Sequence, residues 1–189
     1  LATEQMQRKA TEVIKGEALA LRAMLHFDLA RLYCNAPTAA ADINAANSGI
    51  VLSTEVYDPS YIAPRTTLKQ TYDQILLDFG TALPLLSKEE NNGYINYWAA
   101  LALRARANLY NGDNAAALAD AQAVITGSPY KLYTMEDYTK VWIQEFTSES
   151  ILELKVTTNY TAHRNSVGYY CDSDCYGECA FVEDAPLST

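Results

Sequence analysis

Apolar residues recur three or four positions apart in several stretches of the chain, the spacing of one face of an α-helix. The first stretch runs from Glu4 to Tyr33 and is unusually long. On or near one stripe of this predicted helix lie Ala10, Val13, Ile14, Ala18, Leu21, Leu25, Leu29 and Leu32. Gly16 interrupts the pattern, but one glycine costs only about 1 kcal/mol relative to alanine. We therefore expect a continuous helix.

A second helix is predicted to begin after Thr67. Gln70 follows three positions later, which is the arrangement of a capping box. The apolar stripe of this helix consists of Leu68, Tyr72, Ile75, Leu76, Phe79 and Leu83. We expect the helix to run to about Leu86 and to pair with the first one.

Residues 96–129 predict two short helices folded back on each other. Asn96 is a suitable N-cap, Gly112 can take the left-handed conformation that ends a helix, and Asp113 can cap the next helix. The expected apolar positions are Trp98, Leu101, Ala102, Ala105 and Leu109, then Ala117, Leu118, Ala121, Val124 and Ile125. Small residues around a tight turn, with Pro129 after the second helix, are typical of a tetratricopeptide-type hairpin. Two stacked hairpins predict a mainly α fold.

The remaining stretches lack a helical period. Residues 34–66 carry three prolines, and a segment of this length without regular structure is usually a functional or a flexible loop. Tyr57 and Tyr61 lie in it, and we favour packing against the helices over contact with a ligand. Thr134 with Asp137 predicts a short helix to Ile143, and alternation in residues 150–156 predicts a short strand. We expect one helical domain over 1–189, with a hairpin core in 1–129 and a short helix, a strand and an aromatic loop in 130–189.

Charge and hydropathy exclude some functions. The chain has 23 acidic and 14 basic residues, a net charge of −9, which disfavours nucleic acid and anionic membrane surfaces as partners. An acidic surface is equally ordinary for a soluble protein. No apolar run approaches the roughly 20 residues needed to span a bilayer, and Leu1 does not begin a signal-peptide pattern.

Metal chemistry has weak support. Cys171, Cys175 and Cys179 stand four residues apart, but a structural zinc site normally pairs such cysteines with a second distant pair, and Cys34 is the only other cysteine. Disulfides and free thiols both stay open. For His26 we favour a packed histidine over a metal ligand, because no second ligand lies one turn away. We expect no metal and no cofactor.

Enzymatic motifs are also missing from the sequence: it has no Ser/His/Asp arrangement, phosphate loop or nucleophile elbow, so we expect no enzyme. The remaining candidates are Tyr169, Tyr170 and Tyr176, with Asn165 nearby, in a turn-rich segment. A sugar presents an apolar C–H face to an aromatic ring and hydroxyls to amides and carboxylates. The alternative, packing of these tyrosines against the helices, is favoured by the residues alone.

Several blocks, in order, make the chain resemble the SusD/RagB family of outer-membrane nutrient-binding proteins. These blocks are residues 16–37, 65–86, 98–125, 130–142, 148–155, 165–170 and 175–178. The resemblance implies an α-rich fold with tetratricopeptide-like helix pairs and aromatic loops. It implies capture of glycans at the cell surface and delivery to a SusC-like TonB-dependent transporter. It also implies that Tyr169, Tyr170, Tyr176 and Asn165 contact the ligand.

Two features of such proteins are not seen in these 189 residues. The lipid-bearing N-terminal cysteine is one, so membrane association through a lipid anchor is inferred from the resemblance. The second is the loop-rich half with which family members continue and which contributes to their ligand pocket. The alternative function is a helical-repeat scaffold that binds protein and no sugar.

Overall fold

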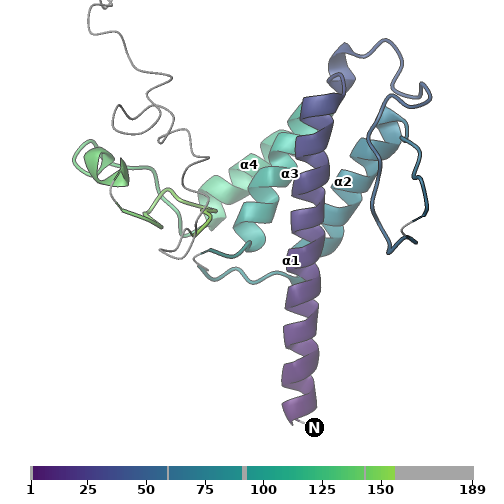
Figure 1. The fold of residues 1–189 in the computed structure, drawn as a ribbon. Coiled ribbons are helices and arrows are strands. Elements are labelled where there is room, and N and C mark those ends of the chain that lie inside the picture. The colour runs from purple at the N-terminus through teal and green to yellow at the C-terminus, as the bar shows by residue number, and fades with distance from the viewer. Residues whose placement is uncertain (1, 59, 91–92, 143, 156–189) are drawn as a thin grey trace, which may run out of the picture. The chain divides into compact units, whose positions relative to one another are not determined.

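The computed structural model describes residues 2–58, 60–90, 93–142 and 144–155, and four α-helices account for most of them. These are α1 (Ala2–Tyr33), α2 (Leu68–Ala82), α3 (Tyr97–Asn111) and α4 (Asn114–Gly127), shown in Figure 1. Short 3-10 helices span Pro37–Ala39, Leu83–Leu85 and Tyr138–Trp142. The chain divides into the units Leu1–Leu154 and Lys155–Thr189, and the description below concerns the first. The predicted mainly α fold is confirmed.

Helix α2 begins as its sequence predicts and ends earlier. The backbone N–H of Gln70 donates to Thr67 Oγ1 at 3.1 Å, and the Thr67 N–H donates to Gln70 Oε1 at 3.0 Å, which completes the capping box. The α-helix ends at Ala82 and not near Leu86, because Pro84 has no N–H and its ring obstructs the preceding turn. The chain continues there as the 3-10 turn Leu83–Leu85.

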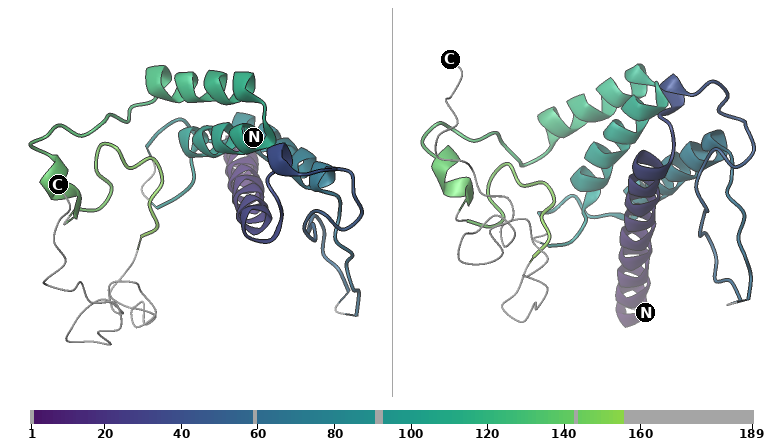
Figure 2. Two further views of the ribbon diagram at one scale, coloured as in Figure 1. Left: turned by 90° about the horizontal axis from the view of Figure 1, so that it is seen from above. Right: turned by 45° about the horizontal axis from the view of Figure 1, so that its top comes forward.

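The hairpin of α3 and α4 is confirmed. The Asn96 side chain accepts from the Ala99 N–H at 3.0 Å, and Asp113 accepts from the Ala116 N–H at 3.0 Å. Gly112 has φ +86°, a left-handed conformation that favours glycine. The two helices lie side by side in both views of Figure 2. Arg104 joins them by donating to the two carboxylate oxygens of Asp120, at 2.8 and 2.6 Å.

The core is built on bulky residues of α2 and small residues of α1. The fully buried set of α2 includes Leu68, Tyr72, Ile75 and Phe79. Helix α1 presents Gly16, Ala20, Ala23, Phe27 and Ala30 to this core. A Cβ added at Gly16 would lie 2.9 Å from Leu85 Cβ, so the glycine allows the close approach. Phe27 contacts the rings of Tyr72 and Tyr110 edge-on, which links α1 to α2 and α3.

The apolar stripe of α1 does not take part in this core. We define the outer stripe of α1 as Ile14, Leu21, Leu25, Leu29 and Leu32, whose exposed fractions run from 40% to 75%. A stripe of this kind usually faces the core of a globular protein. Here the opposite side of the helix, with Gly16, three alanines and Phe27, is buried, and the five aliphatic side chains of the outer stripe are left on the surface.

The segment after the hairpin differs from its prediction. Of the predicted strand 150–156, the described residues 150–155 form bends and irregular backbone. An isolated strand is not stable, and here Ile151 and Leu152, which would alternate in a strand, both pack against the core. Residues 138–142 form a 3-10 helix where a longer helix from Thr134 is predicted, although Thr134 Oγ1 accepts from the Asp137 N–H as a cap would. Within the described ranges, no helix has both the length and the apolar character that crossing a membrane requires.

Candidate functional site

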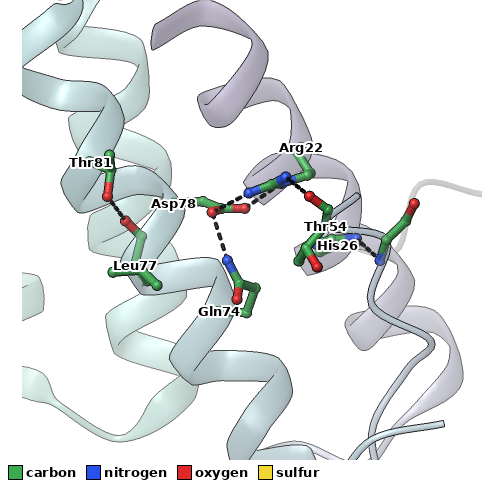
Figure 3. A network of polar contacts seen from close by, with 8 residues as sticks. Arg22, His26, Thr54, Gln74, Leu77, Asp78 and Thr81 are labelled. Atoms are coloured by element: carbon green, nitrogen blue, oxygen red, sulfur yellow. Dashed lines mark hydrogen bonds and ion pairs between the residues drawn. The ribbon is translucent and has the colours of Figure 1, made fainter. Parts of the chain in front are cut away.

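The long loop between α1 and α2 is fixed to both helices, first through a polar network (Figure 3). Arg22 of α1 donates through Nε and Nη2 to the two carboxylate oxygens of Asp78 of α2, each at 2.7 Å. Its Nη1 donates to the Thr54 carbonyl of the loop at 3.1 Å. Gln74 adds a donor to Asp78 Oδ1 at 2.8 Å. Because the Asp78 side chain is only 3% exposed, these donors compensate a carboxylate that would otherwise be costly to bury.

His26 forms a hydrogen bond with the loop residue that precedes Thr54. Its Nε2 accepts a hydrogen bond from the Ser53 N–H at 3.2 Å, while Nδ1 has no hydrogen-bond partner among the described residues. Burial lowers the pKa of the imidazole. The Asp78 carboxylate raises this pKa by a smaller amount, and the positive charge of Arg22 lowers it further. A neutral imidazole is the form that can accept this bond. His26 is therefore an anchor of the loop, and no metal-binding group of His, Cys, Asp and Glu side chains is found in the described part of the chain.

A second set of bonds fixes the two ends of the loop to each other. The Gly49 N–H donates to the Thr66 carbonyl and the Thr66 N–H donates to the Ile50 carbonyl, both at 2.9 Å. Thr71 Oγ1 of α2 accepts from the Ile50 N–H at 3.1 Å. A Cβ at Gly49 would lie 2.2 Å from that hydroxyl oxygen, so this crossing requires glycine. These bonds hold the two ends of the segment 51–65 together, and we call this segment the tied loop.

The tied loop carries a pair of stacked aromatic rings. Tyr57 and Tyr61 lie with ring centroids 5.0 Å apart and planes 17° from parallel. Tyr61 is 53% exposed. Between the two tyrosines, Asp58 accepts from the Ser60 N–H at 2.9 Å and from the Ser60 hydroxyl, and these bonds lower the pKa of its carboxyl. The rings thus stack on each other, a pairing that the sequence spacing did not indicate.

An open concavity of about 790 Å³ lies at the C-terminal end of α1 and the beginning of the loop. Its polar lining includes Asn35, Asp42, Asn47 and Arg65, with Tyr33 as an aromatic wall. Arg65 donates to the Gly49 carbonyl at 2.7 Å and to the Tyr33 carbonyl at 3.1 Å, so its guanidinium is fixed in place. Amides, a carboxylate and a guanidinium offer both donors and acceptors to a hydroxylated ligand.

The ligand contacts predicted from the sequence, Asn165, Tyr169, Tyr170 and Tyr176, lie outside the described residues, as do Cys171, Cys175 and Cys179. Sequence reasoning missed the Arg22–Asp78 pair and Arg65. Asp78 lies one turn after Gln74, at the polar edge of the apolar stripe of α2, so the sequence pattern gave no signal that distinguishes it from a solvent-exposed carboxylate.

Comparison with known proteins assigns the family. Residues 1–109 match the model of a SusD-like family described as starch-binding and associating with the outer membrane, so the chain belongs to the SusD-like family. A SusD superfamily protein from Bacteroides thetaiotaomicron is 39% identical, with a TM-score of 0.73 over 79% of this chain and 32% of that one. A SusD superfamily protein from Bacteroides vulgatus is 34% identical, with a TM-score of 0.80 over 89% of this chain and 39% of that one.

A laminarin-binding SusD-like protein is 26% identical, with a TM-score of 0.62 over 76% of this chain and 31% of that one. A search of the curated proteins found no match. The two SusD superfamily proteins above are matched over 32% and 39% of their own lengths, so the chain spans about a third of the length of these solved relatives.

Proposed function

We propose that this chain forms the helical part of a non-enzymatic glycan-capturing protein of the bacterial outer membrane. The observation that carries the proposal is its membership of a family described as starch-binding and associating with the outer membrane. A relative named as laminarin-binding supports a glycan as the ligand class. In this proposal the protein is held at the cell surface by a lipid anchor and delivers oligosaccharides to a SusC-like TonB-dependent transporter.

The described loop supports a direct contact with sugar. An exposed aromatic ring offers its negatively polarised face to the C–H groups of a pyranose. The Tyr57–Tyr61 pair keeps two rings nearly parallel on a loop that is fixed at its base, which reduces the conformational entropy that a ligand would have to remove. The polar lining of the concavity at the C-terminal end of α1, above all Asn35, Asn47 and Arg65, supplies partners for hydroxyl groups.

Tyr169, Tyr170, Tyr176 and Asn165 are proposed as a second set of contacts, on the reasoning from sequence given above. Several weak contacts of this kind would bind a polysaccharide and release it readily, as transfer to a transporter requires. Neither set involves a metal, a cofactor or a nucleophile in this proposal.

The test is binding of the chain to starch and to laminarin, measured by affinity gel electrophoresis and calorimetry. Tyr57→Ala with Tyr61→Ala is compared with Tyr169→Ala, Tyr170→Ala and Tyr176→Ala. Loss of a stacking contact worth about 1 kcal/mol should weaken binding roughly fivefold to tenfold for each set. Tyr94→Ala is the matched control, since Tyr94 is an exposed tyrosine, 61% accessible, outside both segments.

Retention of binding by both sets of variants would contradict the assigned contacts. Failure of the wild-type chain to bind either polysaccharide would contradict glycan binding by this chain. That second result, together with binding of a protein partner, would favour the alternative of a helical-repeat scaffold, which the exposed outer stripe of α1 makes a specific rival.

A further inference from the structure

One buried titratable side chain contacts the tied loop. His26 of α1 is only 5% exposed, and its Nε2 accepts the Ser53 N–H. This bond requires a neutral imidazole whose proton is on Nδ1, and Nδ1 has no hydrogen-bond partner among the described residues. Histidine is the side chain whose charge ordinarily changes between about pH 5 and pH 8. The contact between α1 and the tied loop therefore depends on a group that titrates near neutral pH.

The charged form of the imidazole does not fit this position. A protonated Nε2 is a donor and would face the Ser53 N–H, which is also a donor, so the bond between them would be lost. On α1, Arg22 lies one turn earlier and repels an imidazolium. On α2, the Asp78 carboxylate attracts it, but both oxygens already accept from Arg22, and Oδ1 also accepts from Gln74 (Figure 3). A buried imidazolium is therefore costly until the loop moves away and admits water.

The aromatic pair of the loop is linked to this contact. The Tyr57 hydroxyl donates to the carbonyl of Leu52, the residue directly before Ser53, at 3.5 Å, and the Tyr57 ring stacks on Tyr61. The bonds that tie the base of the loop join backbone groups and a threonine hydroxyl, and none of these titrates near neutral pH. Loss of the His26 contact would therefore free the two rings while the base of the loop stays closed.

One further bond holds this part of the loop to α1. Arg22 Nη1 donates to the Thr54 carbonyl at 3.1 Å, in an exposed position where water competes for both groups. The Arg22 guanidinium is also paired with Asp78, and that pairing does not require the loop. Because the Thr54 bond is exposed, it contributes less to holding the loop than the more buried contact with His26.

We propose that His26 makes glycan binding by this chain sensitive to pH: its protonation releases the Ser53 backbone, and the Tyr57–Tyr61 pair loses the fixed position in which it meets a sugar. The proposal rests on the function proposed above and adds a means of ligand release to it. A glycan that binds the fixed loop favours the neutral imidazole, and a proton favours the released loop, so each weakens the binding of the other. Acidification would thus promote release of a captured glycan.

The experiment measures laminarin binding to the 189-residue chain by calorimetry at pH 7.5 and pH 5.5. We expect roughly threefold to tenfold weaker binding at the lower pH, the upper limit being complete loss of the ring contacts. The His26→Gln chain, which can still accept the Ser53 N–H but does not titrate there, should bind equally at both pH values. His163→Gln is the matched control, because it removes the other of the two histidines and should keep the pH dependence of the wild type.

Two further measurements distinguish this mechanism from a general effect of acid. Because the linkage is reciprocal, binding at pH 5.5 should release a fraction of a proton, which appears as a heat that depends on the ionisation enthalpy of the buffer. The protection factor of the Ser53 amide against hydrogen exchange should fall over the same pH range in which the imidazole nitrogen resonances of His26 titrate. Both are measured on the wild-type chain, so the test does not depend on the folding of a variant.

Equal affinity of the wild-type chain at both pH values would overturn this regulation and leave the proposed function intact. So would a pH dependence that His26→Gln retains, or one that His163→Gln abolishes. A wild-type chain that binds neither laminarin nor starch at pH 7.5 would instead overturn the proposed function, and this regulation with it.

Discussion

Helices α1 and α2 lie against each other but use their apolar residues in opposite ways. Helix α2 buries its bulky stripe, from Leu68 to Phe79, because it has α1 on one side and α3 on another. Helix α1 buries a face of glycine, alanines and Phe27 and leaves the leucines of its outer stripe on the surface. The amphipathic pattern of α1 therefore did not predict which face of the helix packs in this core.

The difference follows from how closely helices can approach. A glycine and several alanines on α1 allow α2 and the 3-10 turn after it to approach the helix backbone. A Cβ at Gly16 would lie 2.9 Å from Leu85 Cβ of that turn and 3.3 Å from the Ala82 carbonyl oxygen of α2. Dispersion contacts are many and short in such an arrangement. Leucines at the same positions would hold the helices apart. The small face is therefore the one that suits the α1–α2 contact, and the leucines remain available for another one.

Truncation of a bulky residue should affect α2 far more than α1. Phe79→Ala removes a side chain that is 0% exposed, and we expect a loss of about 3–5 kcal/mol in the free energy of unfolding. Leu25→Ala in α1 should change it by no more than about 0.5 kcal/mol, because Leu25 is 58% exposed. Urea unfolding of the 189-residue chain measures both. Equal losses from the two substitutions would show that the stripe is already covered in this chain.

Adding a methyl group should have a smaller effect on the free energy of unfolding, and here the loss should occur in α1 and not in α2. Gly16→Ala in α1 places a Cβ 2.9 Å from Leu85 Cβ and 3.3 Å from the Ala82 carbonyl oxygen, and we expect a net loss of about 1–2 kcal/mol despite the better helix propensity. Gly80→Ala in α2 meets no atom within 4 Å and should gain up to about 1 kcal/mol. Thermal unfolding of both variants distinguishes a tight α1–α2 contact from a loose one. A stabilising Gly16→Ala would contradict the close approach.

The smallest expected effect concerns pH and the polar side of α1. Burial lowers the pKa of His26 below its ordinary value of 6.5, so the unfolded chain binds a proton more readily than the folded one. The stabilising contribution is complete above pH 6.5 and is lost as the pH falls below that value toward the lowered pKa of the folded state. We expect a loss of at most about 1.4 kcal/mol per pH unit in that window, the limit for a single proton.

His26→Gln is the control, since the Gln oxygen can still accept the Ser53 N–H but does not titrate. Unfolding free energies from urea titrations at pH 7.5 and 5.5 are compared for the two proteins, and the other titrating groups cancel in the difference. The same pH dependence in both would exclude His26 as its source. Weaker protection of the Ser53 amide against hydrogen exchange at the lower pH would show, in addition, that the loop is released from α1.

Local sequence signals predicted the four α-helices and several of their ends, but not the end of α2 at Ala82. Thr67 with Gln70, Asn96, Gly112 and Asp113 each act within one turn of the backbone, so their effect could be deduced without knowing the fold. The strand expected at residues 150–156 was wrong over its described part, because a strand depends on a partner that the local pattern does not reveal. For the ligand site, the spacing of Tyr57 and Tyr61 did not indicate that their rings stack.

The amino-acid sequence by itself determined the mainly α fold, the caps and turn of the α3–α4 hairpin, and the resemblance to the SusD-like family. These features depend on hydrogen bonds and periodicities among neighbours in the chain. Tertiary structure decided which face of α1 is buried, the pairing of Arg22 with Asp78, and the tying of the loop through Gly49 and Thr71. Each of these depends on the separation and orientation of segments distant in sequence, which are set only when the helices pack.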